Sequence, residues 1–113
     1  MGVGFDWNKT TGQITLTRGD SLHKLCTLKF DGEIYQMQEG DKIQFGLKAD
    51  YDDKVCLVKK TYTENPFILK IEPEDTKALD FGTYYYDFQI VAANGFTHTF
   101  YEKKKLKLTE EVV

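Results

Sequence analysis

The chain has 113 residues and a formal net charge of −3, with 41% hydrophobic and 14% aromatic residues. A chain of this length forms one domain with one core, and this composition is that of an ordered globular protein and not of a disordered one. The small negative charge provides no global basic field for nucleic acid, and no apolar run approaches the length of about 18 residues that a membrane span needs.

Residues 1–12 are expected to form an N-terminal arm in front of a single domain, residues 13–113. Phe5 and Trp7 are large aromatic residues in this otherwise polar arm, so both need a surface on which to bury. Two interpretations stay open. The arm folds back over the edge of its own core, which we favour, or it docks on a neighbouring subunit. Phe5 and Trp7 are therefore candidate interaction residues.

Alternating apolar and polar residues predict strands in the first third of the chain. Residues 13–18 have the pattern of a half-buried strand. Residues 22–30 predict a second strand whose apolar face includes Cys26, and an Asp-Gly pair at 31–32 is a turn signal. The chain has two cysteines, and free thiols at Cys26 and Cys56 are favoured over a disulfide.

The middle of the chain continues in the same way. Residues 42–49 alternate strictly between apolar and polar positions, as expected for a strand with one buried face. A strand is also expected over residues 55–62, where four consecutive apolar residues leave the buried face undetermined, and another over residues 67–71. The one helical turn expected in the chain lies near residues 74–79.

The strongest pattern is in residues 80–101. Apolar or aromatic residues occupy every second position from Tyr84 to residue 92, which is the period of a strand. An Asn-Gly pair follows, the dipeptide best suited to a type I′ turn. These features predict a long β-hairpin with one aromatic face. Structural roles are expected for its turn and core positions, namely Gly82, Tyr84, Tyr86, Asn94 and Gly95.

A final strand ends the chain around Leu106 and Leu108. In all, about seven to nine short strands separated by turn signals are expected, which is typical of an antiparallel immunoglobulin-like β-sandwich. The predicted fold class is therefore all-β, with at most one short helical turn.

Side chains that carry chemistry in other proteins have a simpler structural interpretation here. His23 and His98 are not at metal-ligand spacing, and the aspartates of residues 50–53 lack the pattern of a calcium loop. Ser21 lies between Asp20 and His23, but a turn explains it better than a catalytic triad, which is assembled from distant segments. No catalytic residue, metal site or cofactor is expected.

The only basic run comprises Lys103, Lys104, Lys105 and Lys107. A nucleic-acid surface would interleave aromatic and basic residues across one face. Charge at the end of an edge strand, which prevents edge-to-edge aggregation, is the favoured interpretation. Neither nucleic acid nor a membrane is an expected partner.

The segment Asp80-x-Gly82-x-Tyr84 is similar to the immunoglobulin pattern in which a tyrosine near the start of a strand forms a tyrosine corner. Tyr86 stands where the disulfide-forming cysteine of antibody domains would follow, so the disulfide version of the fold is excluded.

The chain more closely resembles the small immunoglobulin-like domains of tailed-phage structural proteins, of the kind found at the N-terminus of the baseplate upper protein. The resemblance covers roughly residues 13–109. It is carried by these segments: Arg18-Gly19-Asp20-Ser21, Asp31-Gly32, residues 71–79, residues 82–90 and the Asn94-Gly95 turn.

The resemblance implies a non-enzymatic virion component of the tail, baseplate or head, which is made in the cytoplasm of a bacterial host. Its implied partners are other virion proteins, copies of itself, or both. The alternative is a free-standing module that binds carbohydrate or a host protein. Tyr85 and Tyr101 would form its aromatic platform, because both are expected on the hairpin face opposite Tyr84.

Overall fold

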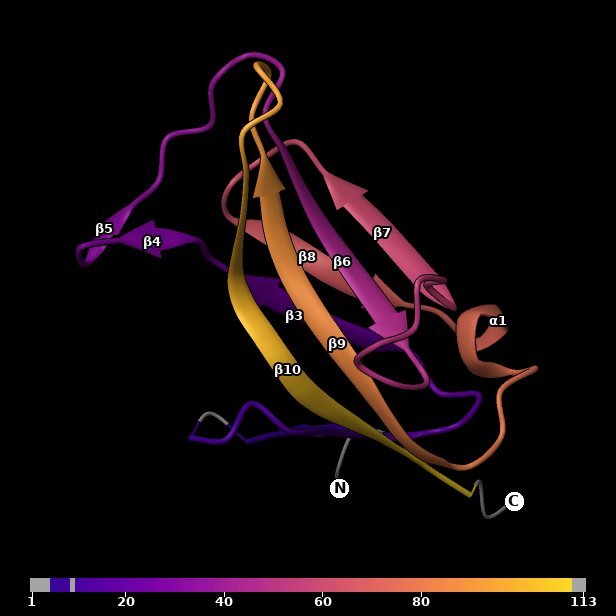
Figure 1. The fold of residues 1–113 in the computed structure, drawn as a ribbon. Helices are drawn as coiled ribbons and strands as arrows, with labels where there is room; N and C mark the ends of the chain where they lie inside the picture. The colour runs from indigo at the N-terminus through magenta and orange to yellow at the C-terminus, as the bar shows by residue number, and fades with distance from the viewer. Residues whose placement is uncertain (1–4, 9, 111–113) are drawn as a thin grey trace.

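The computed structural model describes residues 5–8 and 10–110, which form ten strands and one short helix (Figure 1). The all-β class is confirmed. In chain order the elements are β1 (Phe5–Trp7), β2 (Ile14–Thr17), β3 (Leu22–Cys26), β4 (Lys29–Phe30), β5 (Glu33–Ile34), β6 (Lys42–Lys48), β7 (Val58–Tyr62), β8 (Phe67–Ile71), α1 (Pro73–Thr76), β9 (Gly82–Val91) and β10 (Thr97–Thr109).

Six strands form one curled sheet in the order β1-β2-β10-β9-β6-β7. Its neighbouring strands are antiparallel except for β10 and β2, which run parallel with Leu106 opposite Ile14. The sheet is therefore mixed and not wholly antiparallel as predicted. Parallel neighbours need a long crossover, and here almost the entire chain lies between β2 and β10.

The second layer is the antiparallel pair β3–β8, which lies behind the large sheet in Figure 1. The core between the layers uses every second residue of the strands. In β6 the side chains of Ile43, Phe45 and Leu47 are buried, as the alternation predicted. Phe67 of β8 lies with its ring centroid 5.7 Å from that of Phe88 on β9, so aromatic contacts join the layers.

The structure also shows which side chains are buried in residues 55–62, where the sequence left the buried face undetermined. Val58 is buried, whereas Val55 is 71% exposed. The strand begins only at Val58, because residues 50–57 form the connection that brings the chain from β6 back to its antiparallel neighbour.

The turn between β9 and β10 differs from the predicted type I′ turn. That turn needs positive φ at both central residues, yet Asp31 is the only described non-glycine residue with positive φ. Gly95 has a φ of 91°, its N–H donates to Ala92 O, and Ala92 N–H donates to Phe96 O. This is the pattern of a three-residue loop with glycine at the left-handed position.

Strand β10 contains two register shifts against β9, one between Thr99 and Tyr101 and one between Tyr101 and Lys104. Each shift inserts one extra residue, as a β-bulge does, and so exchanges the faces of the residues that follow. Tyr101 consequently pairs with the buried Phe88. Strand β10 also lies inside the sheet, with Lys107 opposite Thr83 on β9 and Thr15 on β2. The predicted edge position is therefore wrong for Lys107, whereas Lys104 and Lys105 pair with β9 alone.

A tyrosine corner is present at the start of β9. The Tyr84 hydroxyl donates a 2.7 Å hydrogen bond to the carbonyl of Asp80, which is the backbone contact that defines such a corner. Gly82 between them has a φ of 144°, a conformation that disfavours side chains. The expected helical turn is confirmed as α1, which begins one residue earlier than predicted, at Pro73.

The second predicted strand is shorter than expected. Residues 22–30 divide into β3, which ends at Cys26, and β4, which pairs only with β5. Because of this break the alternation does not continue, and Phe30 is exposed although Leu28 is buried. The β4–β5 hairpin projects from the two layers (Figure 1).

Candidate functional site

The structure places two of the four predicted interaction residues around Tyr86 in the core. The ring of Trp7 meets that of Tyr86 edge-on, with centroids 6.1 Å apart, and Tyr101 lies 5.9 Å from the same ring. Strand β1 pairs with β2 of the same chain. Trp7 therefore packs on its own core, which is the interpretation that we favoured. The side chain of Phe5 lies outside the described part of the structure.

An apolar cleft of about 340 Å³ opens beside this cluster. Trp7, Phe100 and Tyr101 line it from one side and Leu28 and Phe67 from the other. Trp7 is the only tryptophan of the chain, so its fluorescence reports on the packing of the arm.

Tyr85 lies on the other side of the sheet. It is half-buried on the face turned away from the core, where its ring centroid is 4.0 Å from that of Tyr51. The predicted platform of Tyr85 and Tyr101 therefore does not form, because the first β-bulge of β10 turns Tyr101 to the core side.

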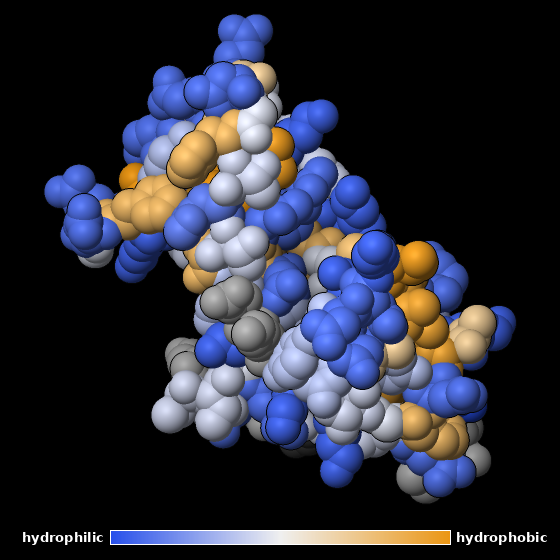
Figure 2. Space-filling model, viewed as in Figure 1, coloured by the Kyte–Doolittle hydropathy of each residue, from blue (hydrophilic) through white to orange (hydrophobic). Residues whose placement is uncertain are grey.

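A different aromatic surface forms at the end of the molecule where the β4–β5 hairpin meets the tip of β9 and β10. We call it the aromatic end and define it as Phe30, Ile34, Tyr35, Phe96 and His98. Three of its side chains are strongly exposed, Phe96 at 66%, Ile34 at 47% and Phe30 at 40%. Four of its residues line a cleft of about 320 Å³ with Ile90 and Ala92. Figure 2 shows apolar atoms gathered in this region, at the upper left.

Ring contacts hold the aromatic end together. The Phe30 ring lies 5.4 Å from Tyr35, nearly perpendicular to it, and 6.2 Å from His98 on β10. Perpendicular aromatic pairs contribute stability beyond the area that they bury. The projecting hairpin is thus tied to the large sheet through Phe30, while part of the same ring faces solvent.

Asn65 fixes the base of the hairpin. Its amide oxygen accepts a 2.8 Å hydrogen bond from Leu28 N–H, and its amide nitrogen donates to Leu28 O at 2.9 Å and to Tyr35 O at 2.7 Å. Leu28 O also accepts a 3.0 Å hydrogen bond from Tyr35 N–H, so the Asn65 amide adds to this backbone pair and satisfies Leu28 N–H and Tyr35 O.

A charged hydrogen bond adds to this anchor. The Tyr35 hydroxyl donates to Asp41 Oδ2 at 2.6 Å, and the Gln38 N–H donates to the same oxygen. The hydrogen bond from Tyr35, followed by that from Gln38, holds the pKa of Asp41 below its ordinary value. The same contact with the carboxylate raises the pKa of Tyr35. Hydrogen bonds to an ionised group are stronger than neutral ones.

Sequence reasoning missed the aromatic end. In the strand predicted over residues 22–30, Phe30 falls on the same apolar face as Cys26, and Phe96 falls on the aromatic face of the hairpin predicted over residues 80–101. Neither is therefore expected at an exposed end of the molecule. One signal was present: an Asp-Gly turn at 31–32 with apolar residues at Phe30 and Ile34 indicates a hairpin too short to bury its own side chains.

The side chains considered for chemistry do not converge. His23 Nε2 lies 2.5 Å from Glu72 Oε1, at the residue that precedes α1, and both side chains are partly exposed. In residues 5–8 and 10–110 no group of three or more His, Cys, Asp or Glu side chains is arranged to hold a metal ion. Cys26 and Cys56 are free.

Comparison with protein-family models, with curated proteins and with solved structures finds no match to this chain. Within the described residues, no helix is long and apolar enough to span a membrane.

Proposed function

We propose that the protein is a non-enzymatic assembly module with an immunoglobulin-like sandwich fold. In this assignment β3 and β8 correspond to strands B and E, and β6, β7, β9 and β10 correspond to C, C′, F and G. Two observations support it: β10-β9-β6-β7 are neighbours in one sheet, and β3 pairs with β8 in the other.

The tyrosine corner supports the same assignment. In immunoglobulin domains this tyrosine lies near the start of strand F, after the E–F connection. Tyr84 lies near the start of β9, after the connection that contains α1, and its hydroxyl bonds back to Asp80. Tyr86, at the position of the second cysteine, packs against Phe45 of β6 with ring centroids 5.6 Å apart.

The observation that carries the function is the location of the aromatic end. In this assignment the β4–β5 hairpin belongs to the B–C connection and residues 92–96 form the F–G loop, and variable domains bind their targets with these loops. Exposed aromatic residues clustered on an otherwise polar surface are typical of protein-binding sites. We infer that the aromatic end docks on another protein.

The resemblance of residues 13–109 to tailed-phage domains supports a partner among virion proteins of the tail, baseplate or head, or a second copy of the chain. The rigid anchor of the hairpin, formed by Asn65 and Asp41, suits an attachment module, because a pre-organised surface loses little conformational entropy on binding.

Site-specific photo-crosslinking tests the proposal. A photoreactive phenylalanine analogue at position 96 is expected to cross-link to one protein in cells that make the particle, and mass spectrometry should find that protein and this chain in purified particles. Val55 provides a matched control, because it is 71% exposed, against 66% for Phe96, and lies outside the aromatic end. Equal cross-linking from both positions, or absence of the chain from purified particles, would contradict the proposal.

A further inference from the structure

The face of the large sheet that is turned away from the core carries a concentration of positive charge. We call it the outer face and define it by the outward side chains of β6, β7, β9 and β10. Figure 2 views the molecule from this side and shows mainly hydrophilic atoms over β9 and β6. Among the side chains that the structure describes on these strands, five outward residues are lysines: Lys42, Lys48, Lys59, Lys105 and Lys107.

Asp87 is the one outward acidic side chain described on these strands. Five lysines and one aspartate give the described outward side chains of these strands a charge of +4, in a chain whose net charge is −3. Such segregation of charge in an acidic protein favours a partner that is itself an anion.

The lysines are arranged in rows across the strands. Lys48 on β6 and Lys105 on β10 both lie opposite Tyr85 on β9. Strands are about 4.8 Å apart, so the backbone positions of the two lysines are separated by about 10 Å. The next row contains Lys59, Gly46 and Asp87, about 7 Å further along the strands. Three lysines therefore lie within two neighbouring rows of the sheet, a spacing that suits an extended ligand.

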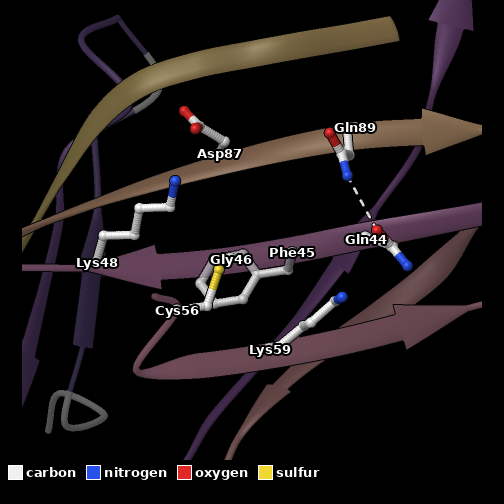
Figure 3. A pocket seen from close by; sticks show the side chains of 8 residues that line it. All are labelled: Gln44, Phe45, Gly46, Lys48, Cys56, Lys59, Asp87 and Gln89. Atoms are coloured by element: carbon white, nitrogen blue, oxygen red, sulfur yellow. Dashed lines mark hydrogen bonds between the residues drawn. The ribbon is translucent and has the colours of Figure 1, made fainter. Parts of the chain in front are cut away.

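A shallow depression of about 130 Å³ lies on this face, and Lys48 and Lys59 are among the residues that line it (Figure 3). Gly46 lies at its floor beside Cys56, and a Cβ atom at position 46 would lie 3.0 Å from Cys56 Sγ. Lys48 and Asp87 lie on one side of Gly46, and Gln44 and Gln89 lie on the other.

The depression offers hydrogen-bond donors and acceptors together. Gln89 Nε2 donates to Gln44 Oε1 at 2.9 Å, and this contact orients both amides while leaving further donor and acceptor positions on each. The Asp87 carboxylate and the lysine ammonium groups lie nearby. The depression therefore suits a ligand whose groups both donate and accept hydrogen bonds, as hydroxyl groups do.

Two aromatic side chains, Tyr51 and Tyr85, lie beside the depression, and we call this pair the aromatic ledge. The Tyr51 ring lies 4.0 Å from that of Tyr85, centroid to centroid, and Tyr51 is 41% exposed. Tyr85 is two residues from Asp87 on the same strand, so the ledge and the depression are neighbours on one face. Aromatic rings provide the flat apolar surface on which the apolar faces of sugar rings pack.

We propose that the outer face binds an anionic polysaccharide. The lysine rows contact the acidic groups, the amides and Asp87 contact hydroxyl groups, and the Tyr51–Tyr85 ledge contacts a sugar ring. An acidic polypeptide would use the lysines without needing the depression. Single-stranded nucleic acid needs spaced aromatic platforms, whereas Tyr51 and Tyr85 lie against each other. This site is separate from the aromatic end and does not depend on the function proposed for it.

The test is binding of four probes by biolayer interferometry in 50 mM and 300 mM NaCl: polygalacturonate, neutral dextran, poly-glutamate and a single-stranded oligonucleotide. We expect polygalacturonate to bind at least tenfold more tightly than the other three, with weaker binding at the higher salt concentration because charge pairs are screened. Equal or tighter binding of poly-glutamate or of the oligonucleotide overturns the proposal, as does failure of polygalacturonate to bind in 50 mM NaCl.

Two variants locate the site. Lys48→Glu with Lys105→Glu is expected to weaken polygalacturonate binding at least tenfold, and Gln89→Ala at least threefold. Lys29→Glu with Lys77→Glu makes the same change of charge at exposed positions away from the outer face, and a twofold effect at most is expected. Trp7 emission checks the fold of each variant. If the two double lysine variants lose the same affinity for polygalacturonate, or if Gln89→Ala binds it as tightly as the wild type, the binding is non-specific charge attraction. Either result would overturn the proposal.

Discussion

The phenol of Tyr86 on β9 donates a hydrogen bond to the backbone carbonyl of Gly12, 74 residues earlier in the chain. This contact joins the centre of the core to the turn between β1 and β2. Burial is the largest cause that raises the pKa of Tyr86, so the phenol keeps its proton and remains a donor. The N-terminal arm is therefore attached to the core by a buried hydrogen bond as well as by Trp7.

Replacing Tyr86 by phenylalanine is expected to lower the free energy of unfolding by about 1–3 kcal/mol, because the Gly12 carbonyl loses its donor in a buried environment. Urea unfolding followed by Trp7 fluorescence measures the loss. Tyr85→Phe is the control, since Tyr85 is only half-buried and lies on the outer face, and a change within about 0.5 kcal/mol is expected there. Equal effects of the two substitutions would contradict the role of the Gly12 contact.

Gly12→Ala should lower the free energy of unfolding by more than the backbone conformation of Gly12 alone would cause, because the new side chain would also collide with Tyr101. Gly12 has a φ of 79°, and a Cβ atom there would lie 2.4 Å from the Tyr101 hydroxyl oxygen. The left-handed conformation alone costs about 1–2 kcal/mol for a residue with a side chain. Gly95→Ala is the matched control in urea unfolding, because Gly95 has a φ of 91° with nothing within 4 Å. If Gly95→Ala lowers the free energy of unfolding as much as Gly12→Ala does, the close approach of Tyr101 to Gly12 does not contribute to the effect.

Asn65→Ala is expected to loosen the β4–β5 hairpin. The substitution removes three hydrogen bonds, to Leu28 N–H, Leu28 O and Tyr35 O. Leu28 O keeps its bond from Tyr35 N–H, but Leu28 N–H and Tyr35 O lose these bonds, and leaving such a group unpaired costs about 1–3 kcal/mol. Hydrogen exchange should become faster at the amides of Leu28 and Tyr35 while the exchange of β9 amides changes less. Asn94→Ala, which removes one exposed hydrogen bond from Phe96 N–H, should leave the exchange of the Leu28 and Tyr35 amides unchanged. Unaltered exchange in Asn65→Ala would show that the Asn65 side chain does not hold the base of the hairpin.

The contact between Tyr35 and Asp41 predicts a specific pH dependence. The pKa of Asp41 is lowered from 3.8 in the folded state, so its contribution to stability is complete above that value and is lost as the pH falls below it. The pKa of Tyr35 is raised from 10.0, so the contribution is also lost at alkaline pH, as the pH rises through the folded value. Between these limits the hydrogen bond should be intact.

Urea midpoints at pH 3, 7 and 11 measure this dependence. The wild-type protein should lose more stability than Tyr35→Phe on going from pH 7 to either extreme, because the variant lacks the hydrogen bond between Tyr35 and Asp41. Parallel pH profiles for the two proteins would show that the contact does not contribute.

Cys26 should react slowly with alkylating reagents. Burial is the main cause that raises the pKa of its thiol from 9.0 to about 11, and the thiolate is the reactive form. Two pH units correspond to about a hundredfold less thiolate at pH 8 than an ordinary thiol has. Mass spectrometry of iodoacetamide-treated protein, native and in urea, measures the difference. Equal rates in both conditions would contradict the burial of Cys26.

The positions of most strands follow from local periodicity. Residues 42–49 alternate strictly, and β6 buries Ile43, Phe45 and Leu47 as expected. The segment similar to a tyrosine corner likewise forms a hydrogen bond from Tyr84 to Asp80, because this contact spans four residues and depends on local geometry. The turn at 92–96 was located correctly but given the wrong type, since Asn94-Gly95 is compatible with more than one loop length.

The interaction surfaces depend on register shifts and strand breaks, which the alternation of apolar and polar residues in the sequence does not reveal. Two extra residues in β10 exchange its faces between Thr99 and Lys104, so Tyr101 joins the core side and the platform with Tyr85 does not form. The break after Cys26 exposes Phe30. A single inserted residue reverses every side chain that follows, and this shift is visible only when the partner strand is in place.

By itself, the sequence determined the all-β class, the hairpin of residues 80–101 and most of the core, because alternation and turn residues act over a few positions along the chain. Only the tertiary structure decided that Trp7 packs on Tyr86, that Phe30, Ile34 and Phe96 gather at one end, and that five lysines share the outer face. These arrangements join residues far apart in the chain, and the pairing and register of whole strands determine which of them meet.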